Sequence, residues 1–225
     1  MIQALVFDLD DTLYLESDFV SSGYRAVARH IAKQHGCRVR EVFHTMMSVF
    51  VTQGREHVLP VIQRRFLGDK IPLSELVEVY RSHTPRIRLL QGYGELLNRL
   101  GKSYKLGLIT DGLPEVQKRK VHALGLEQKM ERIIYTWEYG VEKQKPHSQP
   151  FNLMMECLCS NPLTTLYIGD SLEKDSKGAH GVGMKCIQVL VPGEQRLESV
   201  SGEKADYVLD SLFQLPPILQ AMEEI

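Results

Sequence analysis

The sequence predicts an α/β protein with a doubly wound parallel sheet that is interrupted, after its first strand, by an all-helical insertion. From residue 89 to the end of the chain, short apolar runs alternate with helical patterns. This alternation is typical of strand–helix–strand crossovers in a parallel sheet. From residue 17 to about residue 84, only helical patterns occur. We therefore expect a core domain of residues 1–15 and 86–225 and a helical cap domain of residues 16–85.

The first strand is predicted at residues 3–8, where a short apolar run opens the chain. The helices of the insertion carry apolar residues at helical spacing, and most of them end at a glycine, which is a common helix stop signal. These helices are predicted at residues 17–36, 40–54, 56–68 and 73–83.

The remaining elements of the core alternate between helix and strand. The predicted strands are residues 104–110, 132–136, 164–170, 185–190 and 206–209. The predicted helices are residues 92–101, 114–126, 149–160, 172–183 and 211–225. In an open parallel sheet, ligands bind at the carboxyl ends of the strands, so the residues that follow each strand bear most directly on function.

The composition is that of an ordinary globular protein, with 225 residues, a hydrophobic fraction of 43% and a formal net charge of −1. This balance indicates neither a nucleic-acid nor a membrane partner, and no segment reaches the roughly 20 apolar residues that span a bilayer. The N-terminus opens on a strand without a signal-peptide pattern, and the four cysteines form no C-x-x-C pair, which favours buried free thiols in a reducing compartment. We therefore expect a cytoplasmic protein that is a monomer or a homodimer.

Polar side chains follow four of the predicted strands at the points where the strands end. They are Asp8, Asp10 and Asp11 after the first strand, Thr110 and Asp111 after the second, Lys143 and Lys145 after the third, and Asp170, Ser171 and Asp175 after the fourth. The three carboxylates after the first strand repel one another, so a fold rarely gathers them unless a cation or hydrogen-bond donors compensate. Carboxylates, a hydroxyl and a lysine at neighbouring strand ends are the groups that phosphoryl transfer needs. The sequence therefore predicts a magnesium-dependent phosphoryl-transfer site.

The same strand ends carry a family resemblance. The segment DLDDT at residues 8–12 resembles the D-x-D-x-T signature of the haloacid dehalogenase (HAD) superfamily. LGLITDG at residues 106–112, Lys145 with Pro146, and GDSLEKD at residues 169–175 are similar to its second, third and fourth motifs, and they follow in the family's order. The resemblance implies a Rossmann-like core and a magnesium-dependent phosphomonoester hydrolase. Such an enzyme would act on a small phosphorylated metabolite through an aspartyl-phosphate intermediate.

The resemblance also implies roles for the matching residues. Asp8 would be the nucleophile. Asp10 would be the general acid and base, and we expect its pKa to be raised by the nearby Asp8 so that the acid is protonated at first. Thr110, in a turn with Asp111, would bind a phosphoryl oxygen, and Lys145 would hold Asp8 and the phosphoryl group. Asp111 stands where the family commonly has asparagine, a departure that bears on the positioning of the backbone.

The implied ligands of Mg²⁺ are Asp8, Asp170 and the main-chain carbonyl of Asp10, an all-oxygen set that suits this ion. Asp175 and Ser171 are expected behind these ligands, where Asp175 would bind a metal-bound water or orient a neighbouring group. The insertion is expected to act as a lid that excludes bulk water and selects the leaving group.

Some assignments of residues remain open. Lys143 could take the place of Lys145, and Asp11 is expected on the surface of the loop after the first strand. The run of positive charge at residues 118–120 is expected on a solvated helix face. Six further residues could face a substrate, although each is more often a surface or packing residue. They are Tyr14, Arg25, His30, His57, Arg64 and Arg65.

Two other functions are also compatible with parts of the pattern. A sugar phosphomutase of the same superfamily would carry out related chemistry, but the histidine that such enzymes commonly have shortly after the first motif is missing here. A phospho-accepting signalling module also combines acidic residues, a hydroxyl, a lysine and magnesium. Its phosphorylated aspartate would follow the third strand, whereas Asp8 and Asp10 share the end of the first.

Overall fold

A computed structural model describes residues 1–68, 71–191 and 202–223. Contacts between residues divide the chain into two units. The first, here called the α/β unit, comprises Met1–Leu15 and Arg88–Ile225. The second, here called the helical unit, comprises Glu16–Ile87.

The α/β unit is built on one six-stranded sheet in which all strand pairings are parallel. The strands are β1 (Ala4–Phe7), β2 (Lys105–Thr110), β3 (Arg132–Tyr135), β4 (Thr165–Gly169), β5 (Lys185–Val189) and β6 (Tyr207–Leu209). Their order is β3-β2-β1-β4-β5-β6, so the chain builds the sheet outward from β1 first in one direction and then in the other. The predicted doubly wound parallel sheet is confirmed, and the reversal of strand order beside β1 is where such sheets bind ligands.

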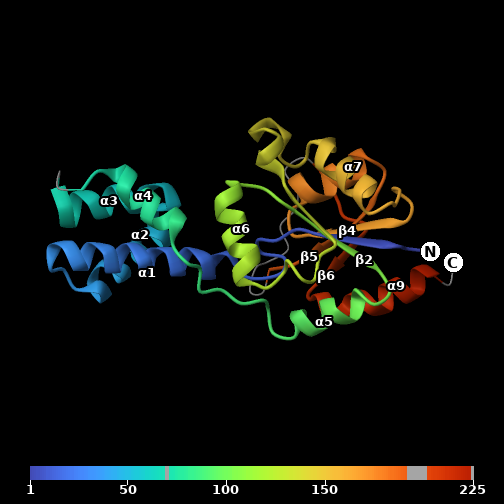
Figure 1. Ribbon diagram of the computed structural model, residues 1–225, viewed down its shortest axis with the longest axis horizontal. Helices are drawn as coiled ribbons and strands as arrows, with labels where there is room; N and C mark the ends of the chain where they lie inside the picture. The colour runs from blue at the N-terminus through green and yellow to red at the C-terminus, as the bar shows by residue number, and fades with distance from the viewer. Residues whose placement is uncertain (69–70, 192–201, 224–225) are drawn as a thin grey trace. The chain divides into compact units, whose positions relative to one another are not determined.

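Helices cover both faces of this sheet, with α7 on one face and α5 and α9 on the other (Figure 1). The helices of the unit are α5 (Tyr93–Leu100), α6 (Pro114–Ala123), α7 (Ser148–Cys157), α8 (Lys177–Gly181) and α9 (Leu215–Glu223). Phe151 and Met154 of α7 belong to a buried apolar cluster with residues of β1, β2, β3, β4 and β5. A Cβ at Gly107 in β2 would lie 2.6 Å from the sulfur of Met154, so this glycine allows α7 to pack closely on the sheet.

The helical unit has an apolar core of its own. Its helices are α1 (Glu16–His35), α2 (Val39–Gln53), α3 (Arg55–Ile62) and α4 (Leu73–Ser82), and a π-helical turn (Gln63–Leu67) follows α3. Each helix contributes buried apolar side chains, such as Tyr24 from α1, Met46 from α2, Ile62 from α3 and Leu76 from α4. The spacing of these residues on the helices therefore accounts for the packing of the unit.

Two of the predicted helices begin differently from the expectation. The segment predicted as a helix at residues 172–183 starts with a π-helical turn (Leu172–Ser176), which precedes the short helix α8. The segment at residues 211–225 starts with a 3₁₀ turn (Leu212–Gln214) before α9. The first of these turns carries Asp175, one of the predicted site residues, beside the carboxyl end of β4.

The cysteines are free, as expected, but they are not all buried. Cys186 lies in the core, whereas Cys157 and Cys159 are exposed at the carboxyl end of α7, so the expectation of buried thiols is wrong for this pair. In the described part of the chain, no helix combines the length and the apolar character that crossing a membrane requires.

Candidate active site

Asp8 lies at the carboxyl end of the central strand, immediately after β1. Its N–H donates to the carbonyl of Ile168 at 2.8 Å, which continues the ladder between β1 and β4 for one more residue. Its carboxylate is buried, and the hydroxyl of Thr12 donates to Oδ2 at 3.4 Å. The sheet therefore fixes the backbone of Asp8, and the following turn supplies a donor to its side chain.

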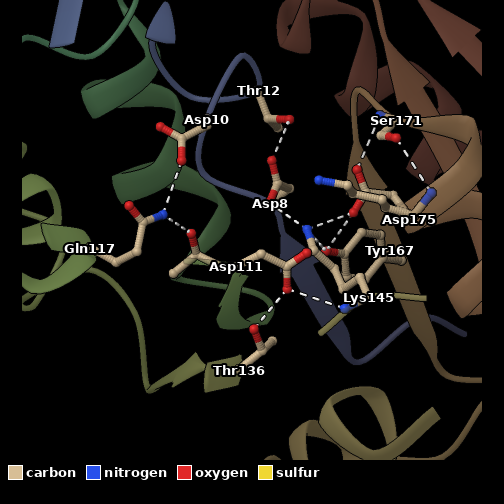
Figure 2. A network of polar contacts seen from close by, with 12 residues as sticks. Asp8, Asp10, Thr12, Asp111, Gln117, Thr136, Lys145, Tyr167, Ser171 and Asp175 are labelled. Atoms are coloured by element: carbon tan, nitrogen blue, oxygen red, sulfur yellow. Dashed lines mark hydrogen bonds and ion pairs between the residues drawn. The ribbon is translucent and has the colours of Figure 1, made fainter. Parts of the chain in front are cut away.

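Lys145 reaches Asp8 from the loop after β3, and the two form a buried cluster with Asp175 and Tyr167 (Figure 2). Its Nζ lies 2.5 Å from Oδ1 of Asp8 and 2.7 Å from Oδ1 of Asp175. The same ammonium donates to the Tyr167 hydroxyl at 3.1 Å. Lys143, which the sequence left as an alternative, is half-buried and makes none of these contacts. Of the two lysines, the structure thus brings Lys145 to Asp8.

The charges in this cluster are strongly coupled. Burial by itself lowers the pKa of Lys145, but Asp175 and Asp8 outweigh it and raise that pKa well above its usual value, so the side chain is an ammonium. Burial raises the pKa of Asp8 well above its usual value; Lys145 opposes this shift, while Asp175 and Asp170 add to it. One ammonium therefore faces more negative charge than it can balance.

Asp170 adds a further carboxylate at the carboxyl end of β4. Burial and the negative charge of Asp175 raise its pKa to about 7. One carboxylate oxygen from each of Asp8, Asp170 and Asp175 lies within 4.8 Å of the others. These are hard oxygen donors with surplus negative charge, which is the donor set that fits Mg²⁺. A divalent cation at this point would offset the repulsion that the lysine leaves uncompensated.

Both oxygens of Asp175, like those of Asp8, accept hydrogen bonds within the protein. Oδ1 accepts from Lys145 and from the Tyr167 hydroxyl, the latter at 3.1 Å, and Oδ2 accepts from the N–H of Ser171 at 3.1 Å. A Cβ at Gly169 would lie 2.3 Å from Oδ2, so glycine at the end of β4 makes room for this carboxylate. These contacts suit a residue that orients Lys145 and the turn after β4.

Asp10, two residues after Asp8, belongs to a separate polar cluster. Nζ of Lys120 lies 2.7 Å from its Oδ1 and 2.9 Å from its Oδ2, and the Tyr14 hydroxyl donates to Oδ1. Nε2 of Gln117 donates to Oδ2 at 2.9 Å. Burial alone would raise the pKa of Asp10, but Lys120 and the other donors outweigh it and lower that pKa below its usual value. The expectation of a raised pKa is wrong, because these donors stabilise the ionised form more than burial destabilises it.

Thr110 and Asp111 end strand β2. The buried hydroxyl of Thr110 accepts from Nε2 of Gln117 at 2.5 Å. Oδ1 of Asp111 accepts from the Thr136 hydroxyl at 2.7 Å and from the main-chain N–H of Lys145 at 3.2 Å (Figure 2). The side chain of Asp111 therefore ties the end of β2 to the loop that carries Lys145, and any contact with phosphate would fall to its main chain.

Lys120 and Gln117 were not expected in the site. The prediction that the charged run at residues 118–120 is solvated is wrong for Lys120, which is 4% exposed, although Lys118 beside it is exposed. The available signal was the spacing in α6: Gln117, Lys120 and Val121 are its buried residues, and they lie three and four positions apart on one face.

Among the residues suggested as possible substrate contacts, Tyr14, His30 and Arg25 have local partners. Tyr14 belongs to the α/β unit, is fully buried and donates to Asp10. Within the helical unit, His30 lies 2.7 Å from a carboxylate oxygen of Glu75, and the guanidinium of Arg25 lies 4.2 Å from the ring centre of Phe43.

Comparison with known proteins gives a consistent result. A family model for haloacid dehalogenase-like hydrolases matches residues 5–189. A glyceraldehyde 3-phosphate phosphatase from Methanocaldococcus jannaschii is 28% identical over 231 residues, which cover 100% of both chains. Pyrophosphatase PpaX from Bacillus mycoides is 28% identical over 232 residues, which cover 97% of both chains. Among solved structures, the magnesium-bound HAD hydrolase YfnB from Bacillus subtilis shares the fold, with a TM-score of 0.68 and 22% identity over 97% of this chain and 98% of that one.

Proposed function

The chain belongs to the haloacid dehalogenase-like hydrolase family, and we propose that it is a phosphatase that cleaves small phosphomonoesters with Asp8 as nucleophile and Mg²⁺ as cofactor. The observation that carries this proposal is the buried contact of Lys145 with Asp8, beside the oxygens of Asp170 and Asp175. The names of the two relatives compared above support the same class of reaction. Their substrates are small and phosphorylated, and we propose a substrate of that kind for this chain.

The proposed reaction has two steps. In the first, a carboxylate oxygen of Asp8 attacks phosphorus, the bond from phosphorus to the leaving oxygen breaks, and that oxygen takes a proton from Asp10. This step requires that Asp10 take up a proton in the enzyme–substrate complex, although Lys120 lowers its pKa in the free protein. In the second, Asp10 takes a proton from water as the water oxygen attacks phosphorus. The bond between phosphorus and Asp8 then breaks, which releases inorganic phosphate and restores the carboxylate.

Other residues of the cluster would stabilise charge during these steps. The ammonium of Lys145 would neutralise Asp8 and a phosphoryl oxygen, and the hydroxyl of Thr110 would donate to another phosphoryl oxygen. The carboxylates of Asp8 and Asp170, with the main-chain carbonyl of Asp10, would hold Mg²⁺. When bound, the ion supplies the positive charge that lets a carboxylate approach a phosphate dianion.

The proposal is tested by measuring phosphate release from a panel of phosphorylated metabolites, with Mg²⁺ and with EDTA. The wild type should release phosphate from at least one member of the panel only when Mg²⁺ is present. Asp8→Asn should abolish release, because an amide cannot form the acyl phosphate. Asp210→Asn is the matched control, since Asp210 is exposed and follows β6 at the edge of the sheet. Full activity of Asp8→Asn, or activity in EDTA, would contradict the proposal.

A further inference from the structure

Lys120 is a buried lysine whose ammonium faces one carboxylate. Lysine is almost never fully buried unless it is paired, and Lys120 pairs with both oxygens of Asp10, at 2.7 and 2.9 Å. Lys118, two residues earlier on α6, shows the ordinary alternative, because its side chain is 54% exposed and its Nζ lies 2.6 Å from Glu138. Two lysines on one helix thus have opposite surroundings, since one is buried against a carboxylate and the other is exposed to solvent.

Gln117, one turn earlier on α6, joins Asp10 to Thr110. Its Nε2 donates to Oδ2 of Asp10 at 2.9 Å and to the Thr110 hydroxyl at 2.5 Å, so both of its amide hydrogens are engaged. The opposite orientation of the amide would place its oxygen against the carboxylate of Asp10, where two acceptors would repel each other. The contacts therefore define which way the amide points.

This orientation determines the direction of the Thr110 hydroxyl. Because its oxygen accepts a hydrogen bond from Gln117, its own hydrogen remains available to donate elsewhere. In the proposed reaction that hydrogen would serve a phosphoryl oxygen, while Asp10 would exchange a proton with the leaving group and with water. Gln117 thus holds two functional groups at a fixed separation on neighbouring strand ends.

Stability alone does not account for this arrangement. Transferring an ammonium and a carboxylate from water into a buried site carries a desolvation penalty that their attraction often fails to recover. Apolar side chains at positions 117 and 120 of α6 would not carry that penalty. The buried pair is therefore better explained by what it does to Asp10 and Thr110.

We propose that Lys120 and Gln117 are positioning residues, which hold the carboxylate of Asp10 beside the hydroxyl of Thr110 in the geometry needed for proton transfer to and from the reacting phosphate. The proposal rests on the proposed phosphatase function. It predicts that both residues act through Asp10 and Thr110 without touching the substrate.

The first test compares Lys120→Met with Lys118→Met, which makes the same chemical change at the exposed lysine of α6. With glycerol 3-phosphate, whose leaving group needs a proton, Lys120→Met should lower kcat by about 10- to 100-fold, which is no more than the low end of the effect of general acid–base catalysis because Asp10 itself remains. With 2,4-dinitrophenyl phosphate, whose leaving group needs none, the first turnover should change less than about threefold. Lys120→Arg should recover part of kcat, and Lys118→Met should match the wild type.

The second test is a double-mutant cycle between positions 10 and 120. If Lys120 acts only through Asp10, adding Lys120→Met to Asp10→Asn should change kcat by less than about twofold. Circular dichroism and melting curves identify variants that fail to fold. If Lys120→Met is one of them, Gln117→Met tests the same geometry without leaving a buried charge. It should slow the hydrolysis of glycerol 3-phosphate more than that of 2,4-dinitrophenyl phosphate.

The outcomes separate this proposal from the one on which it rests. If the wild type releases no phosphate, or Asp8→Asn remains active, the proposed function fails and the basis of the positioning role fails with it. If the wild type is active but folded Lys120→Met retains its kcat, only the positioning role fails. The positioning role alone would also be overturned if Lys120→Met slowed the hydrolysis of the two esters equally, or if its effect on kcat were fully additive with that of Asp10→Asn.

Discussion

Replacing Lys145 with methionine would remove the ammonium that two buried carboxylates share. In the wild type, Nζ lies 2.5 Å from Asp8 and 2.7 Å from Asp175, and the side chain of Lys145 is 3% exposed. Methionine keeps an unbranched apolar chain but carries no charge. Asp8 and Asp175 would then remain buried, with Asp170 nearby and without the ammonium that faces them in the wild type.

The size of the effect follows from this burial. Removing one partner of a buried ion pair destabilises a protein by about 3–5 kcal/mol. In a chain of this length, each kcal/mol shifts Tm by about 2–4 °C. We therefore expect Lys145→Met to lower Tm by about 6–20 °C at about pH 7.5 when EDTA is present. Protonation removes the charge of the uncompensated buried carboxylates. The difference in Tm between Lys145→Met and the wild type should therefore shrink as the pH falls towards about 5.

Thermal unfolding followed by circular dichroism would test this expectation. Lys143→Met is the matched control, because Lys143 is in the same loop and makes none of the contacts of Lys145. It should move Tm by no more than about 2 °C, as most substitutions outside buried networks do. If Lys145→Met also melted within about 2 °C of the wild type, the ammonium would contribute no net stability and the reasoning from the buried ion pair would be refuted.

Three further predictions concern other parts of the α/β unit. Mg²⁺ at about 100 times its Kd should stabilise the wild type by about 2.7 kcal/mol in melting experiments but should not shift Asp170→Asn; equal shifts would exclude Asp170 as a ligand. His180 has two carboxylate partners, at 2.6 and 2.9 Å; burial lowers its pKa, but these partners outweigh burial and raise it. The contribution of His180 to stability is therefore complete below the pKa of about 6.5 that it has in the unfolded chain. This contribution is lost as the pH rises through the pKa of the folded state. The Tm of the wild type should therefore exceed that of His180→Gln by more at about pH 6 than at about pH 8.5. Gly169→Ala should displace the carboxylate of Asp175, which should lower the free energy of unfolding by about 1–3 kcal/mol and reduce phosphatase activity. Gly181→Ala is the control, because its Cβ would meet no atom within 4 Å, and it should leave stability and activity unchanged. A stable, active Gly169→Ala would show that the displacement does not occur.

The strand ends were predictable from the sequence because each apolar run stops at a polar residue. Asp8, Thr110 and Asp170 follow three strands that the sheet places side by side, so topology alone brings them near one another. The choice between Lys143 and Lys145 was harder. Only the path of the loop after β3 decides which of the two ammonium groups reaches Asp8.

The surroundings of Asp10 were not predictable in the same way. Its expected pKa was reasoned from Asp8, its neighbour in sequence, but the group that dominates in lowering it is Lys120, more than a hundred residues later. Lys120 stands in a run of three basic residues that resembles a solvated surface. Which of the three turns inward depends on where α6 begins, at Pro114, and on how the helix packs. Long-range contacts of polar side chains leave little periodic signal in a sequence.

The position of β1 in the sheet has a consequence for the order of events during synthesis. Ala4 pairs with Lys105 on one side and with Thr165 on the other, so β1 leaves the ribosome before both of its partners and is paired on both sides only after some 160 further residues are made. At ordinary translation rates this delay is roughly 8–30 s. The apolar run Ala4–Phe7 has at least one unpaired edge during that interval and is prone to aggregate, so nascent chains truncated before β4 should depend on chaperones to remain in solution.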